Sequence, residues 1–239
     1  MDDHSIDPVF EKDNTGADDA SVARWSVTDT WLGLGLLIVL MGVAVFAMTR
    51  ISSTNERMFA GIFVEALGLV PITIIFLWRK ISWKDLGFRK FDKNILGVGC
   101  GLVIAAYIVI IVHNLIMMAF GVLTQGDAIF KIFGKLDSPF LFFFVGVIVA
   151  PLTEEIFFRG FLFKGFRQKY GWKAALILSS LIFGASHLQL AAFIPTFLLG
   201  CVLTYVYHRA DSLFPGMILH CAINSFGLCA AFAVFKFGG

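Results

Sequence analysis

The sequence is poor in charge. Only 15% of its 239 residues are charged, against about a quarter in ordinary soluble proteins, and the formal net charge is +2. With so little net charge and no basic stripe, a nucleic-acid partner is not expected. A soluble globular domain is also excluded, because 58% of the residues are hydrophobic and the mean hydropathy is +0.84.

Other features that the sequence lacks narrow the class of protein further. There is no internal repeat, and no secretory signal with a basic start and a short apolar region, so we expect the first apolar run, near Trp31, to be a retained anchor. No Cys-x-x-Cys pair or zinc-ribbon spacing occurs, which predicts that the cysteines are packing residues. These cysteines are Cys100, Cys201, Cys221 and Cys229.

Long apolar runs are abundant. Crossing about 30 Å of hydrocarbon takes about 20 residues of helix, and seven stretches approach or exceed that length. The sequence therefore predicts an all-α, polytopic helical bundle in the lipid bilayer, an integral membrane protein. The predicted spans are Trp31–Thr49, Met58–Trp78, Ile95–Phe120, Pro139–Phe163, Trp172–Leu188, Ala191–Tyr207 and Leu213–Phe235.

The distribution of basic residues predicts the orientation. Lys and Arg concentrate in residues 79–93 and 164–173, two loops that seven spans place on the same side of the membrane. Because positively charged loops stay in the cytoplasm, we expect a cytoplasmic amino terminus and an external carboxyl terminus. Residues 1–27 are acidic and polar, which predicts a disordered cytoplasmic tail.

A few ionisable residues lie inside the predicted spans, where each costs ~2.5–3.5 kcal/mol. Glu155 and Arg159 are four residues apart and share a helix face, so they can form an ion pair. Glu154 points about 100° away and can face a cavity as a general base. Pro151 can kink the helix and admit water. An interfacial ion pair is the alternative interpretation of this segment.

Two more segments carry polar groups. His220 and Asn224 are also four apart, and this spacing aims both at one neighbour, where they could hold a metal, a water or a carbonyl oxygen. His187 follows small residues that allow close helix packing. By helical rise, His187 lies ~22 Å deep, against ~10–16 Å for the other three site residues. Hydrogen bonds between helices are the alternative for both segments. At Glu65 and at His113 we expect an interhelical or interfacial contact.

Together, three segments of the sequence resemble the three motifs of the CPBP family of CAAX proteases and bacteriocin-processing enzymes. These segments are Glu154-Glu155-x-x-x-Arg159, Phe183-x-x-x-His187 and His220-x-x-x-Asn224. The resemblance implies a catalytic membrane core over residues 139–239, preceded by further transmembrane helices over residues 28–138. It implies an intramembrane endopeptidase that cleaves a membrane-associated protein or peptide, either prenylated or not.

The resemblance also implies roles for single residues. Glu154 would activate water with help from His187, His220 and Asn224 would bind a metal or the oxyanion, and Glu155 and Arg159 would organise the first motif. A divalent metal such as zinc, held by Glu154, His187 and His220, would make the protein a metalloprotease. A metal-free mechanism uses the same residues.

Two other functions fit the same composition. One is a bacteriocin-immunity or scaffold protein that keeps the fold without turnover. The other is a proton-coupled transporter, since buried Glu and His also form proton relays, although no inverted repeat supports it.

Overall fold

The protein is a helical membrane bundle. The computed structural model describes residues 23–136 and 138–238, which form helices and no strand, as predicted. Six helical runs are long and apolar enough to cross a membrane, so the protein is an integral, multi-pass membrane protein. The elements outside the longest run are α1 (Val27–Met48), α2 (Thr54–Leu67), α3 (Val70–Arg79), α4 (Trp83–Leu86), α5 (Asn94–Ala119), α6 (Gln125–Phe133), α10 (Leu190–Ala210) and α11 (Leu213–Phe237).

The longest run explains why six runs are found where seven spans were predicted. It extends over 47 residues, from Phe140 to Ser186, and a straight helix of that length would measure about 70 Å. The chain turns within it at Gly171, where φ is 73° and ψ is 166°. Glycine adopts this left-handed φ without a Cβ clash. Two predicted spans therefore correspond to the two arms of this run.

The first arm alternates between α-helical and wider π-helical turns. Such turns have hydrogen bonds from residue i to i+5 and occur often at functional sites. Pro151 lies at the junction of a π-helical and an α-helical segment. In order, the segments are α7 (Phe140–Phe144), η2 (Val145–Val149), α8 (Ala150–Glu154), η3 (Glu155–Phe163) and α9 (Lys164–Ser186), which also contains the turn.

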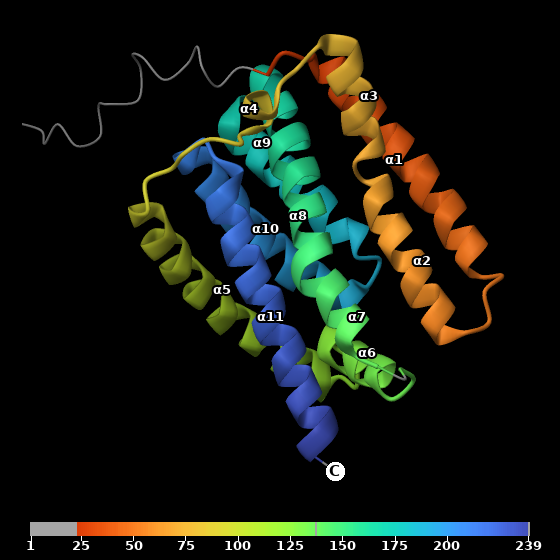
Figure 1. Ribbon diagram of the computed structural model, residues 1–239. Coiled ribbons are helices and arrows are strands. Elements are labelled where there is room, and N and C mark those ends of the chain that lie inside the picture. Colours follow the sequence, from red (N-terminus) through yellow and green to blue (C-terminus); the bar gives the residue numbers. More distant parts are fainter. Residues whose placement is uncertain (1–22, 137, 239) are drawn as a thin grey trace, which may run out of the picture.

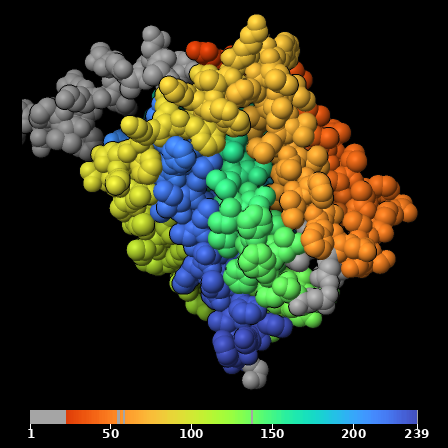
Figure 2. Space-filling model, viewed as in Figure 1, coloured from red at the N-terminus to blue at the C-terminus, as the bar shows by residue number. Residues whose placement is uncertain are grey.

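The run from α7 to η3 lies in the middle of the bundle (Figure 1). On the face drawn in Figure 2, α11 lies directly beside it, with α5 beyond α11 and with α2 and α3 on the other side. Behind this face, α10 packs on both α5 and α9, while α1 packs on α3 and α9. The central run is therefore covered from several sides, which allows polar side chains on it to be buried.

The two basic loops meet at one end of the bundle, where α4 lies (Figure 1). Lys164 donates from Nζ to the Asp85 carbonyl oxygen at 2.7 Å, and Arg24 lies 3.4 Å from the Asp85 carboxylate. The carboxyl-terminal end of α11 and the helix α6 lie at the opposite end (Figure 1). Both loops therefore share one side of the membrane.

The start of the bundle differs from the prediction. Most of the predicted tail, residues 1–22, lies outside the described residues. Residues 23–27, however, are ordered: Trp25 is only 1% exposed, and its ring stacks on Phe161 with centroids 5.5 Å apart. Ser26 caps α1 by accepting a hydrogen bond from the Asp29 N–H. Residues 23–27 thus belong to the packed bundle, because the large apolar side chain of Trp25 is buried against Phe161.

Candidate active site

The site is built on a buried ion pair. Nη1 of Arg159 lies 2.9 Å from Oε1 of Glu155, one helical turn away as the spacing predicts, and both side chains are 0% exposed. The Arg159 guanidinium carbon lies 4.5 Å from the ring centroid of Phe183, a cation–π contact from α9. Since a buried charge without a partner is very costly, each member of the pair requires the other.

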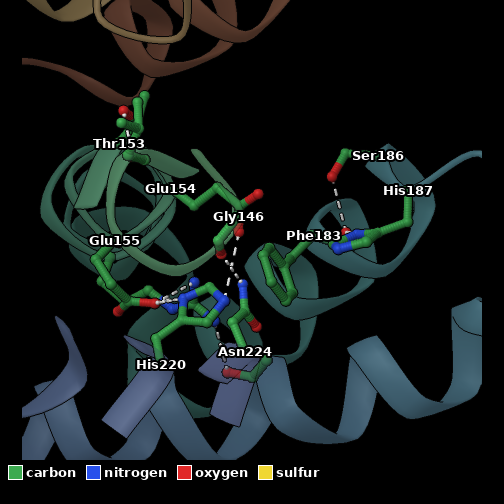
Figure 3. A network of polar contacts seen from close by, with 12 residues as sticks. Gly146, Thr153, Glu154, Glu155, Phe183, Ser186, His187, His220 and Asn224 are labelled. Carbon is green, nitrogen blue, oxygen red and sulfur yellow. Dashed lines mark hydrogen bonds and ion pairs between the residues drawn. The ribbon is translucent and has the colours of Figure 1, made fainter. Parts of the chain in front are cut away.

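His220 connects this pair to Glu154. Its Nδ1 lies 2.9 Å from Oε1 of Glu155, and its Nε2 lies 3.6 Å from Oε2 of Glu154 (Figure 3). The His220 side chain is 6% exposed, whereas that of Glu154 is 22% exposed. One carboxylate is therefore sealed between Arg159 and His220, and the other remains accessible.

Asn224 donates a hydrogen bond to a backbone carbonyl that has no helical donor in the central run. The Ala150 N–H donates to the Val145 carbonyl, and Pro151 has no N–H, so the Gly146 carbonyl lacks both of its helical donors. The Asn224 Nδ2 donates to that carbonyl at 2.8 Å (Figure 3). Pro151 thus leaves the Gly146 carbonyl without a donor from its own helix, and Asn224 of α11 supplies one. This bond fixes the Asn224 carboxamide beside His220.

His187 is held differently. It follows the last residue of α9, and its Nδ1 lies 2.9 Å from the Phe183 carbonyl oxygen. Because a carbonyl only accepts, Nδ1 carries the hydrogen and Nε2 of a neutral ring is the acceptor. The Phe183 ring contacts both imidazoles, with centroid distances of 5.0 Å to His187 and 5.9 Å to His220 (Figure 3).

All four polar residues border one cavity of about 400 Å³, which lies among the helices and is also lined by residues of α5, α6 and α10. These four are Glu154, His187, His220 and Asn224. A cavity of this size can hold several residues of an extended peptide. The structure therefore brings the three motif segments to one place, with Glu155 and Arg159 behind the wall.

Gly216 also belongs to the site, although none of the three sequence motifs includes it. A Cβ at this position would lie 2.8 Å from Oε2 of Glu155, so only glycine lets α11 approach the buried carboxylate this closely. Gly216 lies one turn before His220, so both face the same side of α11. This spacing could have indicated from the sequence that Gly216 lies near the site.

Glu65 also belongs to the surroundings of the site. Glu65 of α2 interacts electrostatically with Glu154. One turn further along α2, Gly68 packs against Thr153, the neighbour of Glu154. The sequence predicts an interhelical or interfacial contact for Glu65, and the packing of α2 on α8 places it near Glu154. His113, for which the same kind of contact was predicted, contacts its neighbour Asn114 on the same helix, with Nδ1 3.3 Å from Oδ1.

The predicted metal ligands do not converge on one point. Among the residues that the structure describes, no three His, Cys, Asp or Glu side chains lie close enough together to hold a metal ion. Glu154 and His220 are neighbours, but His187 forms no ion pair with Glu154 in the described part of the chain. In this arrangement the three side chains do not fit a catalytic zinc, which needs three ligands around one centre.

Comparison with known proteins agrees with the motifs. Residues 136–226 match the family model described as type II CAAX prenyl endopeptidase Rce1-like. The match covers less than half of the chain and shows that this segment is similar to the family. The matched segment contains all three motifs, from Glu154 to Asn224, and the match confirms the resemblance that they indicated.

Relatives extend the similarity beyond this segment. The UPF0177 protein YxdF of Lactococcus lactis is 26% identical over 163 residues, which cover 66% of this chain and 90% of the relative. The "Putative membrane peptidase YdiL" of Bacillus subtilis is 26% identical over 160 residues, which cover 65% of each chain. An "Uncharacterized 24.3 kDa protein" of Escherichia coli is 35% identical over 86 residues, covering 34% of this chain and 40% of the relative. No solved structure matches the chain.

Proposed function

We propose that this protein is an intramembrane endopeptidase that hydrolyses a peptide bond in a membrane-associated protein or peptide. One observation carries the proposal: the accessible Glu154 carboxylate and the His220 imidazole lie 3.6 Å apart on the wall of a cavity inside the bundle. A carboxylate and an imidazole this close can bind one water between them and the substrate. The Rce1-like match and a peptidase-named relative support this assignment.

In the mechanism that we propose, Glu154 takes a proton from water, and the hydroxide oxygen bonds to the carbonyl carbon of the scissile peptide. His187 accepts a hydrogen bond from that water through Nε2. Asn224 has a second Nδ2–H besides the one bound to Gly146, and this N–H stabilises the oxyanion together with His220. Glu154 then returns the proton to the leaving nitrogen as the C–N bond breaks.

The buried pair prepares His220 for this task. Glu155 accepts the Nδ1–H, which orients the ring, and Arg159 balances the charge of Glu155. A protonated His220 would donate to Glu155 from Nδ1 and to the oxyanion from Nε2. The charges of Arg159, Glu155, His220 and Glu154 would then sum to zero, so the buried cluster would carry no net charge.

We also propose that the end with α4 and the two basic loops faces the cytoplasm. The amino terminus of the described chain lies at this end (Figure 1). Accumulated Lys and Arg favour the cytoplasmic side. Labelling of single cysteines placed in residues 79–93 or near Phe237, in sealed vesicles of known orientation, would test this.

The decisive test is cleavage of a membrane-peptide library by the purified protein in detergent. Glu154→Gln should lower the rate by ~10²–10⁴-fold while leaving helix content unchanged. Glu56→Gln, which changes an exposed carboxylate at the start of α2, is the matched control and should retain full activity. Undiminished cleavage by the Glu154→Gln variant would refute the assignment.

Further arms of this experiment separate the alternatives. Under the proposed mechanism a chelator leaves the rate unchanged, whereas loss of activity that zinc restores would establish a metal enzyme. An immunity or scaffold protein would keep its protective phenotype in the Glu154→Gln variant. A transporter would show substrate-dependent proton flux in liposomes.

A further inference from the structure

The structure has a second hollow, which lies between α1 and the end of α9. Its volume is about 420 Å³, and none of its described lining residues lines the catalytic cavity. One side is a stripe along residues 34–45 of α1, and the other side is made by residues 157–158 of η3 and by residues between 182 and 188. We call this hollow the α1–α9 groove.

The groove is continuous with the lipid-facing surface of the bundle. α1 is a membrane-spanning helix at the edge of the bundle (Figure 1), and Ile38, Val45 and Leu188 of the groove are exposed. Among the described lining residues, Ser186 is the only one with a polar side chain, and its hydroxyl donates to the Phe183 carbonyl at 2.8 Å. Since a polar ligand would find no partner there, the groove suits a hydrocarbon ligand.

The groove has the dimensions of one hydrocarbon chain. From Leu34 to Val45 its α1 side is ~16 Å long by helical rise, close to the roughly 15 Å depth of one leaflet. Spread over that length, a volume of about 420 Å³ corresponds to a width of ~5 Å. A helix with its side chains is about 10–12 Å across and is too wide, whereas a chain of CH₂ groups in contact at about 4 Å fits. The shape therefore favours an acyl chain over a substrate helix or a second copy of this protein.

The groove contacts the turn that carries His187. Ser186 and Leu188 line the groove, whereas His187 between them lines the catalytic cavity. Phe158 of the groove wall contacts Phe183 of the cavity wall, with ring centroids 5.0 Å apart, and Phe183 contacts His187. This ring pair stands between the two hollows. A lipid of the bilayer reaches the groove directly, whereas a chain attached to a substrate in the cavity would have to pass the rings.

We propose that the α1–α9 groove binds one acyl chain of a membrane phospholipid and that this chain holds the His187 turn in place. Only the effect on activity rests on the proposed endopeptidase function; the binding does not. Leu188 is exposed beside the groove and has a φ of 53°. A chain in the groove covers this apolar side chain, and its burial favours the conformation in which His187 lines the cavity.

Binding is tested with a phosphatidylcholine that carries a photoreactive diazirine on one acyl chain, in phosphatidylcholine liposomes that contain the wild-type protein. Mass spectrometry maps the cross-links. Labelling of Ile38 and Ile182 in the groove should exceed that of Ile104 and Ile108 on the exposed face of α5 by about tenfold. Equal labelling of the two sets would overturn the proposal. A peptide with its own acyl chain that abolishes the groove labelling would show that the occupant comes from the substrate, and would also overturn it.

Gly42→Leu should fill the groove. A Cβ at Gly42 would meet no atom within 4 Å, and leucine is a better helix former than glycine, so the variant should fold. Labelling of Ile182 should fall by about tenfold, because displacement of two CH₂ groups of the chain has an effect of that size. Gly101→Leu, at an equally open glycine of α5 outside the groove, is the matched control and should be labelled like the wild type. Unchanged labelling of Gly42→Leu would contradict the proposal.

The effect on the site is tested with a cleavable peptide that carries no hydrocarbon chain. In detergent, added phosphatidylcholine should raise the kcat/KM of the wild type and of Gly101→Leu by about fivefold or more. Gly42→Leu should cleave at the same rate with and without the lipid. An equal response to lipid in both variants would refute the link to His187. If no peptide is cleaved by the wild type, the endopeptidase function fails, and the labelling alone decides whether the groove binds an acyl chain.

Discussion

The two imidazoles of the site are supported very differently. His220 is 5% exposed and contacts two carboxylates, one of which is paired with a fully buried arginine. His187 stands at the end of α9 and is held by one bond to a carbonyl of its own helix. The next residue, Leu188, has a φ of 53°, which is strained for a leucine, and it is 83% exposed.

The difference shows which half of the site is fixed before substrate arrives. The half around His220 is fixed by packing and charge, as a preorganised oxyanion site requires. The position of His187 depends on the short turn between α9 and α10, in which Leu188 is exposed. We therefore expect substitutions near His220 to lower stability and activity together, and substitutions at His187 to lower activity alone.

The largest effect is expected at Arg159. Arg159→Met leaves the buried Glu155 without its partner and should lower the free energy of unfolding by ~3–5 kcal/mol, with loss of cleavage. Thermal unfolding in detergent measures this. Arg209→Met, at an exposed arginine near the end of α10, is the control and should change stability by less than ~0.5 kcal/mol. Equal stability of the two variants would show that the ion pair does not hold this half of the site.

Asn224 should show a smaller effect with a specific rescue. Asn224→Leu leaves the Gly146 carbonyl without a donor and should cost ~1–3 kcal/mol. Pro151→Ala supplies an N–H at the i+5 position, so the double variant should recover part of that loss. A double-mutant cycle on unfolding free energies measures the coupling. Strict additivity would contradict the proposed link between Pro151 and Asn224.

His187 should affect activity with almost no effect on stability. His187→Ala should slow cleavage by ~10²–10⁴-fold, because the water loses an acceptor. The unfolding free energy should change by less than ~0.5 kcal/mol, since the side chain makes one bond at a helix end. If His187→Ala destabilises the protein as much as Asn224→Leu, the contrast between the two halves is wrong.

The smallest effect is expected at Asp85, at the end of the bundle that carries the two basic loops. Burial opposes the charge of Asp85, but hydrogen bonds from the Ser82 backbone and hydroxyl, with Arg24 and Lys164 nearby, lower its pKa. Its stabilising effect is therefore complete above the unfolded value of about 3.9 and is lost as the pH falls through the lower folded value. Asp85→Asn should cost about 1 kcal/mol or less at pH 6, and this cost should begin to fall below about pH 4 and vanish only at lower pH. Unfolding at several pH values measures it, and a cost that persists at the lowest pH would refute it.

Much of the fold could be predicted from the sequence because lipid imposes a simple rule. Spans must be apolar and about 20 residues long, so the positions of α1, α5 and α11 follow from hydropathy alone. The helix α6 was not predicted, because nine residues at the end of the bundle carry no such signal. The break between α2 and α3 was also missed, although Pro71 near the start of α3 marks it.

The candidate active site could be predicted only in part from the sequence. The pairing of Glu155 with Arg159 is local, since residues four apart on a helix face one direction, and the sequence predicts it. The partner of Asn224 could not be predicted, because the open carbonyl of Gly146 exists only in a π-helical turn followed by proline. The depth estimate set His187 apart from the other three residues, and this estimate stays a prediction. In the structure His187 is held by a bond to its own helix at the end of α9.

By itself, the sequence determined that the chain is a helical membrane protein and which residue types form its polar centre, because hydropathy and helical spacing are properties of single segments. Tertiary structure decided which carboxylate is sealed and which is accessible, that α2 brings Glu65 toward Glu154, and that the cavity has no cation in its described lining. These features depend on contacts between helices distant in the chain, and no pattern within one segment encodes such contacts.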